Sequence, residues 1–101
     1  MTHPAYTDIS LAELETLRQQ ANALVVDVRD DWEFDEFNLG GVNIPLADIR
    51  ARRAELVPYD PVIVLCTNGV RSRVAAKDLR RHPEFSEKTI YHLHGGIAEG
   101  E

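Results

Sequence analysis

Cysteine is nearly absent from this chain, which limits how the fold is stabilised. Cys66 is the only cysteine among 101 residues, so no internal disulfide forms. A chain without disulfides is typical of a reducing compartment, and we expect a cytoplasmic protein. His92 and His94 alternate near the C-terminus, but no further ligands stand at a convincing metal-binding spacing. The sequence therefore predicts no metal site and no cofactor.

Long apolar runs are also missing. No run approaches the roughly 20 residues that a membrane-spanning helix needs. The first ten residues, MTHPAYTDIS, contain neither a basic region nor an apolar stretch typical of a signal peptide. We therefore expect no membrane partner.

Positive charge is scarce overall but locally concentrated. The formal net charge is -6, which disfavours binding to nucleic acid or to an anionic membrane. Five of the eleven basic residues nevertheless lie within 71–81, beside the thiol. This patch favours a small anion or an acidic partner. For its distal members, Lys77, Arg80 and Arg81, an ordinary solvated helix face is the favoured interpretation.

Short apolar runs alternate with helical patterns along the whole chain. Strands are expected at about 24–28, 40–46, 62–66 and 88–94, and helical segments at about 10–20, 30–37, 46–56 and 72–81. Ser10 and Glu13 form a capping box at the start of the first helix. Buried strands joined by helices predict a parallel sheet covered on both faces, within one domain over residues 1–101.

Cys66 stands at the carboxyl end of the most apolar strand, where parallel sheets commonly bind ligands. Gly69 permits a tight turn whose amides would form a nest for an anionic sulfur, in front of a helix N-terminus. A buried packing cysteine needs none of these features, so a reactive thiolate is favoured. The loop that would hold the substrate consists of Thr67, Asn68, Gly69, Val70, Arg71 and Ser72.

Three charged residues outside the loop are candidates for supporting it. Asp27 and Arg29 follow another strand, where they are in a position to tune Cys66, although we favour their holding the loop by ion pairs. Glu33 is a second candidate partner for Arg71. The pair Gly95–Gly96 is expected to allow close backbone approach near the loop.

Four segments appear in an order that resembles one known family. They are VVDVRDDWEF, GGVNIPL, CTNGVRS and IYHLHGGI. Together they resemble a rhodanese, or sulfurtransferase, domain over residues of roughly 6 to 98. The resemblance implies a rhodanese-like three-layer α/β fold of the single-domain type. Its central sheet is expected to be mainly parallel, with about five strands and helices on both faces.

The same resemblance implies a sulfurtransferase or persulfide carrier. Cys66 would take a sulfane sulfur from thiosulfate or a persulfide, and pass it to a thiol, cyanide or a protein acceptor. A non-catalytic rhodanese-like binding module remains an alternative. A small phosphatase or arsenate reductase is disfavoured by the length of the loop. Four residues separate Cys66 from Arg71, whereas the loop of phosphatases of related fold resembles a cysteine and an arginine separated by five residues.

Overall fold

A single parallel sheet forms the centre of the molecule. The structure is a computed structural model that describes residues 4–100. Its sheet has the order β1-β5-β4-β2-β3, and every neighbouring pair of strands is parallel. The strands are β1 (Thr7–Ile9), β2 (Leu24–Asp27), β3 (Val42–Asn43), β4 (Val62–Leu65) and β5 (Ile90–Leu93). The prediction of a five-stranded parallel α/β fold is confirmed.

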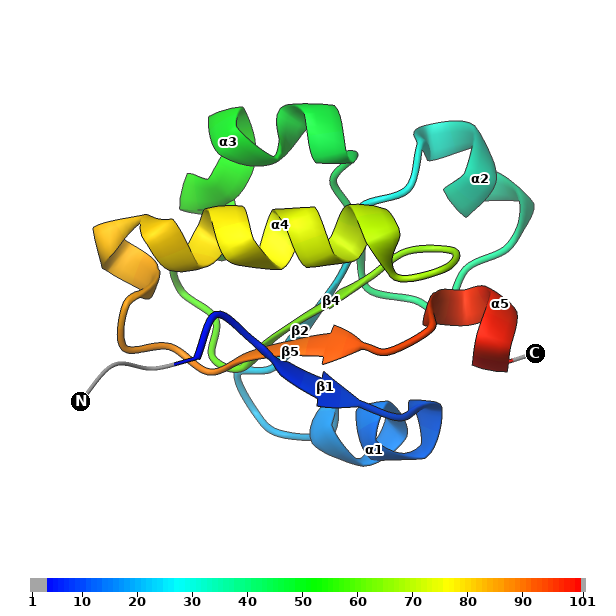
Figure 1. Cartoon of the computed structure of the whole chain (residues 1–101), viewed down its shortest axis with the longest axis horizontal. Helices are drawn as coiled ribbons and strands as arrows, with labels where there is room; N and C mark the ends of the chain where they lie inside the picture. Colours follow the sequence, from blue (N-terminus) through cyan, green and yellow to red (C-terminus); the bar gives the residue numbers. More distant parts are fainter. Residues whose placement is uncertain (1–3, 101) are drawn as a thin grey trace.

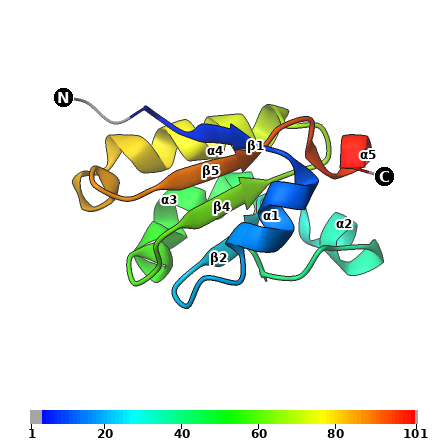
Figure 2. The ribbon, with the colours of Figure 1, turned by 90° about the horizontal axis from the view of Figure 1, so that it is seen from below.

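Helices cover both faces of this sheet (Figures 1 and 2). They are α1 (Leu11–Leu17), α2 (Asp31–Glu36), α3 (Ile49–Arg52), α4 (Val70–Arg81) and α5 (Gly96–Gly100). Three 3-10 turns, Leu46–Asp48, Arg53–Leu56 and Pro83–Phe85, complete the description. None of the helices within residues 4–100 is both long and apolar enough to cross a bilayer.

Two apolar clusters sandwich the sheet. One lies under α3 and α4 and contains Ile49, Ala76 and Leu79. The other lies under α1 and α5 and contains Leu14 and Ile97. All four residues of β4 are buried, because this strand has a strand on each side and helices on both faces. The carboxyl end of β4 is therefore anchored by the best-packed part of the fold.

Several expected boundaries shift in the structure. β1 was not expected; it is an edge strand of three residues, of which only Ile9 is buried. Segment 46–56 is a short helix flanked by two 3-10 turns rather than one helix. α4 begins at Val70, two residues before the expected start, because Gly69 in a left-handed conformation (φ +93°) ends the preceding turn there. The capping box at Ser10 and Glu13 is present as predicted.

Candidate active site

Cys66 lies directly after β4, at the start of a loop that leads into α4. Its side chain is fully buried, with an exposed fraction of 0%. The loop turns through Gly69, and its left-handed backbone (φ +93°) is the conformation that glycine adopts most readily. The strand, the turn and the helix start therefore meet at the sulfur atom.

Three polar groups surround that sulfur atom. The backbone N–H of Gly69 donates to Cys66 Sγ at 3.1 Å, and the N–H of Ser72 donates at 3.4 Å. The hydroxyl oxygen of Ser72 lies 3.3 Å from the same sulfur. The N-terminus of the twelve-residue α4 also presents the positive end of its dipole to this point. An anionic sulfur is well matched to these surroundings, whereas an inert packing thiol needs no such donors.

Arg71 does not point freely at the sulfur but is bound to α2. Its two terminal nitrogens donate to the two oxygens of Glu33, at 2.7 and 3.0 Å. The Thr67 hydroxyl donates to the same carboxylate at 3.2 Å and accepts from Arg71 at 3.3 Å. Glu33 is therefore the partner of Arg71, as the sequence indicated. This cluster joins α2 to both ends of the loop.

The environment of Glu33 strongly favours its ionised form. The hydrogen bonds from Arg71 are the main cause that lowers the pKa of Glu33 to about 2. The backbone N–H of Asp30 also donates to Glu33, at 3.0 Å, which is part of the capping of α2. In turn, the Glu33 carboxylate raises the pKa of Arg71. Both charges are thus held near neutral pH.

The C-terminal glycine pair brings α5 against the loop. The N–H groups of Ile97 and Ala98 donate to the carbonyls of Cys66 and Thr67, at 2.9 and 2.8 Å. Gly96 has a left-handed φ of +70°, and a Cβ there would collide with those same two carbonyls. The expected close backbone approach is confirmed at this glycine.

In the part of the chain that the structure describes, Asp27 and Arg29 form no hydrogen bond or ion pair with the loop, so the prediction that they hold it by ion pairs is wrong. Within residues 4–100 they pair with each other, with Arg29 Nη2 2.8 Å from Asp27 Oδ2. The same nitrogen donates to the carbonyl of Phe37 at 2.6 Å. Both side chains are buried. They fix the segment between β2 and β3, because Arg29 joins the Asp27 carboxylate to the backbone carbonyl of Phe37.

The remaining loop and helix residues fall into two groups. Asn68 and Val70 are exposed, and the Asn68 carboxamide oxygen accepts from the Val70 N–H at 3.1 Å. Lys77 and Arg81 are exposed on α4, as expected of a solvated face, and Arg73 is exposed as well. Arg80 is different, since it donates to the carbonyls of Ala5, Phe85 and Ser86. Its partial burial lowers its pKa, and its role is to hold the end of α4.

Sequence reasoning missed one residue beside the thiol. His92, on β5, is fully buried, and its Nε2 lies 2.8 Å from Ser72 Oγ. Its other ring nitrogen lies 2.9 Å from a carboxylate oxygen of Asp8, on β1. A histidine inside an otherwise apolar strand was the available signal. Within the described residues, no group of three or more potential ligands is arranged to hold a metal ion.

The comparison with protein-family models decides the family. Residues 10–101 match the model described as a rhodanese-like domain. The chain belongs to the rhodanese-like domain family. The match includes β4, the Cys66 loop and α4, and so covers the candidate site as a whole.

Named relatives and a solved structure agree with a rhodanese-like domain. The chain is 38% identical over 89 residues to the uncharacterized protein YqhL of Bacillus subtilis, covering 87% of this chain and 68% of that protein. It is 30% identical over 73 residues to the putative sulfur carrier protein YrkF of the same organism, covering 67% of this chain and 40% of YrkF. The crystal structure of thiosulfate sulfurtransferase from Pseudomonas aeruginosa superposes with a TM-score of 0.70 at 29% identity, over 91% of this chain and 18% of that one.

Proposed function

We propose that this rhodanese-like domain is a sulfurtransferase or persulfide carrier, with Cys66 as the nucleophile. The observation that carries the proposal is the position of Cys66 Sγ, which receives the N–H groups of Gly69 and Ser72 at the N-terminus of α4. Donors fixed before the reaction stabilise negative charge without having to reorganise. The Cys66 thiolate before the transfer and the outer sulfur of the persulfide after it both carry negative charge, which suits such a cradle.

In the first step, the Cys66 thiolate attacks the outer sulfur of the donor. With thiosulfate, the thiolate supplies the electron pair of the new S–S bond, and the S–S bond of thiosulfate breaks with its pair leaving on sulfite. The products are a Cys66 persulfide anion and sulfite, so total charge is conserved. The N–H groups of the loop are the groups available to hold the persulfide anion.

In the second step, an acceptor removes the outer sulfur. A thiolate or cyanide attacks that sulfur, and the S–S pair returns to Cys66 Sγ as the thiolate. Cyanide leaves as thiocyanate and a thiol leaves as its persulfide. No metal or organic cofactor enters either step, and two displacements in sequence are characteristic of covalent catalysis.

The spacing of the loop and the names of relatives support sulfur transfer over phosphate chemistry. Four residues separate Cys66 from Arg71, and the Arg71 guanidinium is already bound at both ends by Glu33. It is therefore not free to clamp a phosphoryl group. One relative is named a putative sulfur carrier, and one structural neighbour a thiosulfate sulfurtransferase.

The proposed partners are a small anionic sulfur donor and a thiol or protein acceptor. Thr67 and Asn68, directly after Cys66, are neutral, so the loop offers little positive charge to a dianion such as thiosulfate. We therefore propose a persulfide as the better donor. Because Cys66 is fully buried, any donor reaches Sγ only after neighbouring groups of the loop move aside.

Mass spectrometry of the intact protein tests the proposal. After treatment with thiosulfate or a low-molecular-weight persulfide, the parent protein should gain one sulfur atom on Cys66, and cyanide should remove it as thiocyanate. Cys66→Ser should fold and gain none, because a neutral hydroxyl is a poor acceptor of sulfane sulfur. A folded parent that gains no sulfur from either donor would instead support the non-catalytic binding module.

A further inference from the structure

A chain of short contacts joins Cys66 to the surface of the sheet edge. Cys66 Sγ lies 3.3 Å from Ser72 Oγ, and Ser72 Oγ lies 2.8 Å from His92 Nε2. His92 Nδ1 lies 2.9 Å from Asp8 Oδ1. Ser72 and His92 are fully buried, whereas the Asp8 side chain is 52% exposed. This series of contacts therefore connects the buried thiol to a carboxylate in contact with water.

The groups that face His92 fit a ring with a proton on each nitrogen. Its Nε2 is also 3.1 Å from the carbonyl oxygen of Gly69, and a carbonyl can only accept. Its Nδ1 faces the Asp8 carboxylate, which when ionised can also only accept. Both contacts are satisfied together only when each ring nitrogen carries a proton. Such a ring would be an imidazolium paired with Asp8.

This arrangement also orients the hydroxyl of Ser72. When His92 Nε2 donates, the Ser72 oxygen accepts, and its own proton is free to point at Cys66 Sγ. The sulfur then has three donors, namely the hydroxyl of Ser72 and the N–H groups of Ser72 and Gly69. A thiolate benefits from the third donor more than a neutral thiol does.

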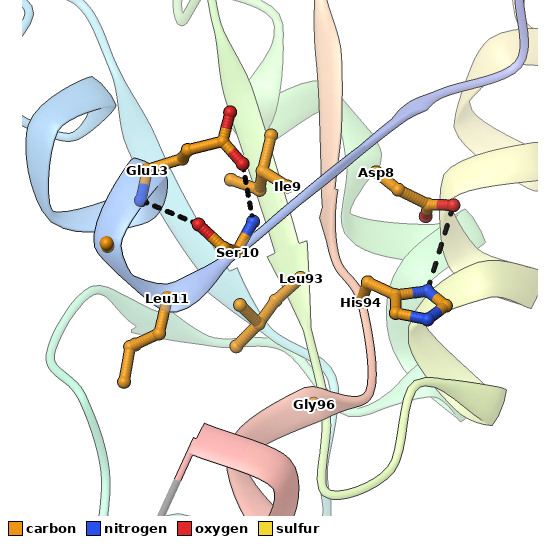
Figure 3. A pocket seen from close by; sticks show the side chains of 9 residues that line it. Asp8, Ile9, Ser10, Leu11, Glu13, Leu93, His94 and Gly96 are labelled. Carbon is orange, nitrogen blue, oxygen red and sulfur yellow. Dashed lines mark hydrogen bonds and ion pairs between the residues drawn. The ribbon is translucent and has the colours of Figure 1, made fainter.

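Among residues 4–100, three further ionisable groups are placed close to His92 or to its partner Asp8, namely Tyr6, Cys66 and His94. Asp8 approaches from β1, and the ring of Tyr6, which precedes that strand, lies 5.0 Å away, centroid to centroid. Cys66 is reached through Ser72 on α4. His94, exposed beyond the end of β5, lies 3.8 Å from the second oxygen of Asp8. Figure 3 shows this Asp8–His94 contact at the edge of an open groove of about 520 Å³.

We propose that Asp8 and His92 are positioning residues that hold the Ser72 hydroxyl as a donor to Cys66 and couple the thiolate to the protonation of His92. The effect of Asp8 and His92 on catalysis rests on the proposed sulfur transfer. In the second step of that reaction the S–S electron pair returns to Cys66 Sγ, and the Ser72 O–H stabilises the returning charge. No proton needs to be transferred along the chain, and the atom and charge balance of both steps is unchanged.

Asp8→Asn gives opposite results for two possible roles of this carboxylate. If Asp8 acted only as a negative charge near the thiol, removing it would ease thiolate formation and lower the pH midpoint of Cys66 alkylation by iodoacetamide. If it acts through His92, its loss favours the neutral imidazole and raises that midpoint. We expect a rise of about 0.5 pH unit or more. His94→Gln is the matched control, since it removes an imidazole from the same carboxylate without a contact to Ser72, and it should leave the midpoint in place.

A second variant and a spectroscopic measurement complete the test. The amide of His92→Gln retains a donor near Gly69 and Ser72 but cannot carry a charge, so its midpoint should rise and should not change further when Asp8→Asn is added. Nitrogen-15 NMR of the parent near neutral pH should show a proton on each ring nitrogen of His92. A midpoint that falls or stays constant in Asp8→Asn, or a single ring proton on His92, overturns the proposal. If the parent gains no sulfur from either donor, the proposed function fails, while the alkylation and NMR results still decide the Asp8–His92 chain.

Discussion

The guanidinium of Arg71 binds both oxygens of Glu33, at 2.7 and 3.0 Å, and so ties the start of α4 to α2. The two residues are 38 positions apart in the sequence and belong to different helices. The paired geometry fixes the guanidinium plane, which a single ion contact does not. The pair therefore stabilises the loop at the expense of free positive charge beside Cys66.

Removing the Glu33 charge should destabilise the fold in a pH-dependent way. Its pKa is lowered to about 2 from an ordinary value of 4.5, so the stabilisation is complete above pH 4.5 and is lost as pH falls toward 2. Glu33→Gln should lower the free energy of unfolding by about 1–2 kcal/mol at pH 7, a figure reduced for solvent screening of a partly exposed pair. Urea unfolding at pH 7 and pH 2.5 measures this.

The control for this variant lies on the same helix. Glu36 is exposed, and Glu36→Gln should change the free energy of unfolding by less than about 0.5 kcal/mol at either pH. The difference between Glu33→Gln and the parent should shrink at pH 2.5, where the parent carboxyl is partly protonated. A difference that is the same at both pH values would show that the charge of Glu33 is not what stabilises the loop.

Gly96→Ala should be much more damaging than another glycine substitution at positive φ. At Gly96 (φ +70°) a Cβ meets the backbone carbonyls of Cys66 and Thr67, which cannot move without breaking the contacts to α5. At Gly40 (φ +87°) the nearest atom is the terminal nitrogen of the flexible Arg18 side chain. Gly96→Ala should reduce the free energy of unfolding by about 2–4 kcal/mol, and Gly40→Ala by about 1 kcal/mol. Equal losses in thermal or urea unfolding would contradict the close-approach argument.

How much could be predicted from the sequence differs between the fold and the site. The buried strand before Cys66, the glycine turn and the helix after it carry local signals, and so could be placed from residue types alone. Glu33 was one of the candidate partners of Arg71, and the structure shows that it is the partner. β1 has only one buried residue, Ile9, and too short a run to show a period, so its pairing with β5 could not be predicted.

The missed strand explains the missed residues of the site. Asp8 reaches His92 only because β1 lies beside β5, with Asp8 and His92 in register. Without β1, a histidine in an apolar strand had no visible partner. The opposite error was made for Asp27 and Arg29. They lie at the expected strand end and were predicted to hold the loop, but they pair with each other. Strand position indicates which residues are near an edge of the sheet, but not which way a side chain turns.

Breaking the buried Asp27–Arg29 pair should affect stability and not chemistry. Asp27→Asn leaves the Arg29 guanidinium buried without its counter-charge, and should lower the free energy of unfolding by about 3–5 kcal/mol. Glu55→Gln, at the exposed Arg52–Glu55 pair, should cost less than about 1 kcal/mol. Because neither Asp27 nor Arg29 bonds to the loop within the described residues, the folded fraction of Asp27→Asn should still gain one sulfur from thiosulfate. Loss of the persulfide in folded protein would assign Asp27 a role at the thiol.

The last prediction concerns the preference of the loop for its donor. Thr67 is engaged by Glu33 and Arg71, whereas Asn68 is exposed and, among the described residues, its side chain bonds only to the N–H of Val70. Asn68 is therefore the position where a positive charge can be added without breaking the Glu33–Arg71 cluster. Asn68→Lys should lower the KM for thiosulfate by a factor of about 1.4 to 5 relative to Asn68→Met, as an exposed ion pair contributes about 0.2–1 kcal/mol. The methionine variant loses the same contact to Val70 and has a side chain of similar length without charge.

Raising the salt concentration should remove most of the difference in KM between the two variants, since exposed charges are screened. Steady-state kinetics with thiosulfate and with a neutral persulfide donor measure both effects. Equal KM values for thiosulfate in the two variants would show that charge at this position does not limit the use of thiosulfate as a donor.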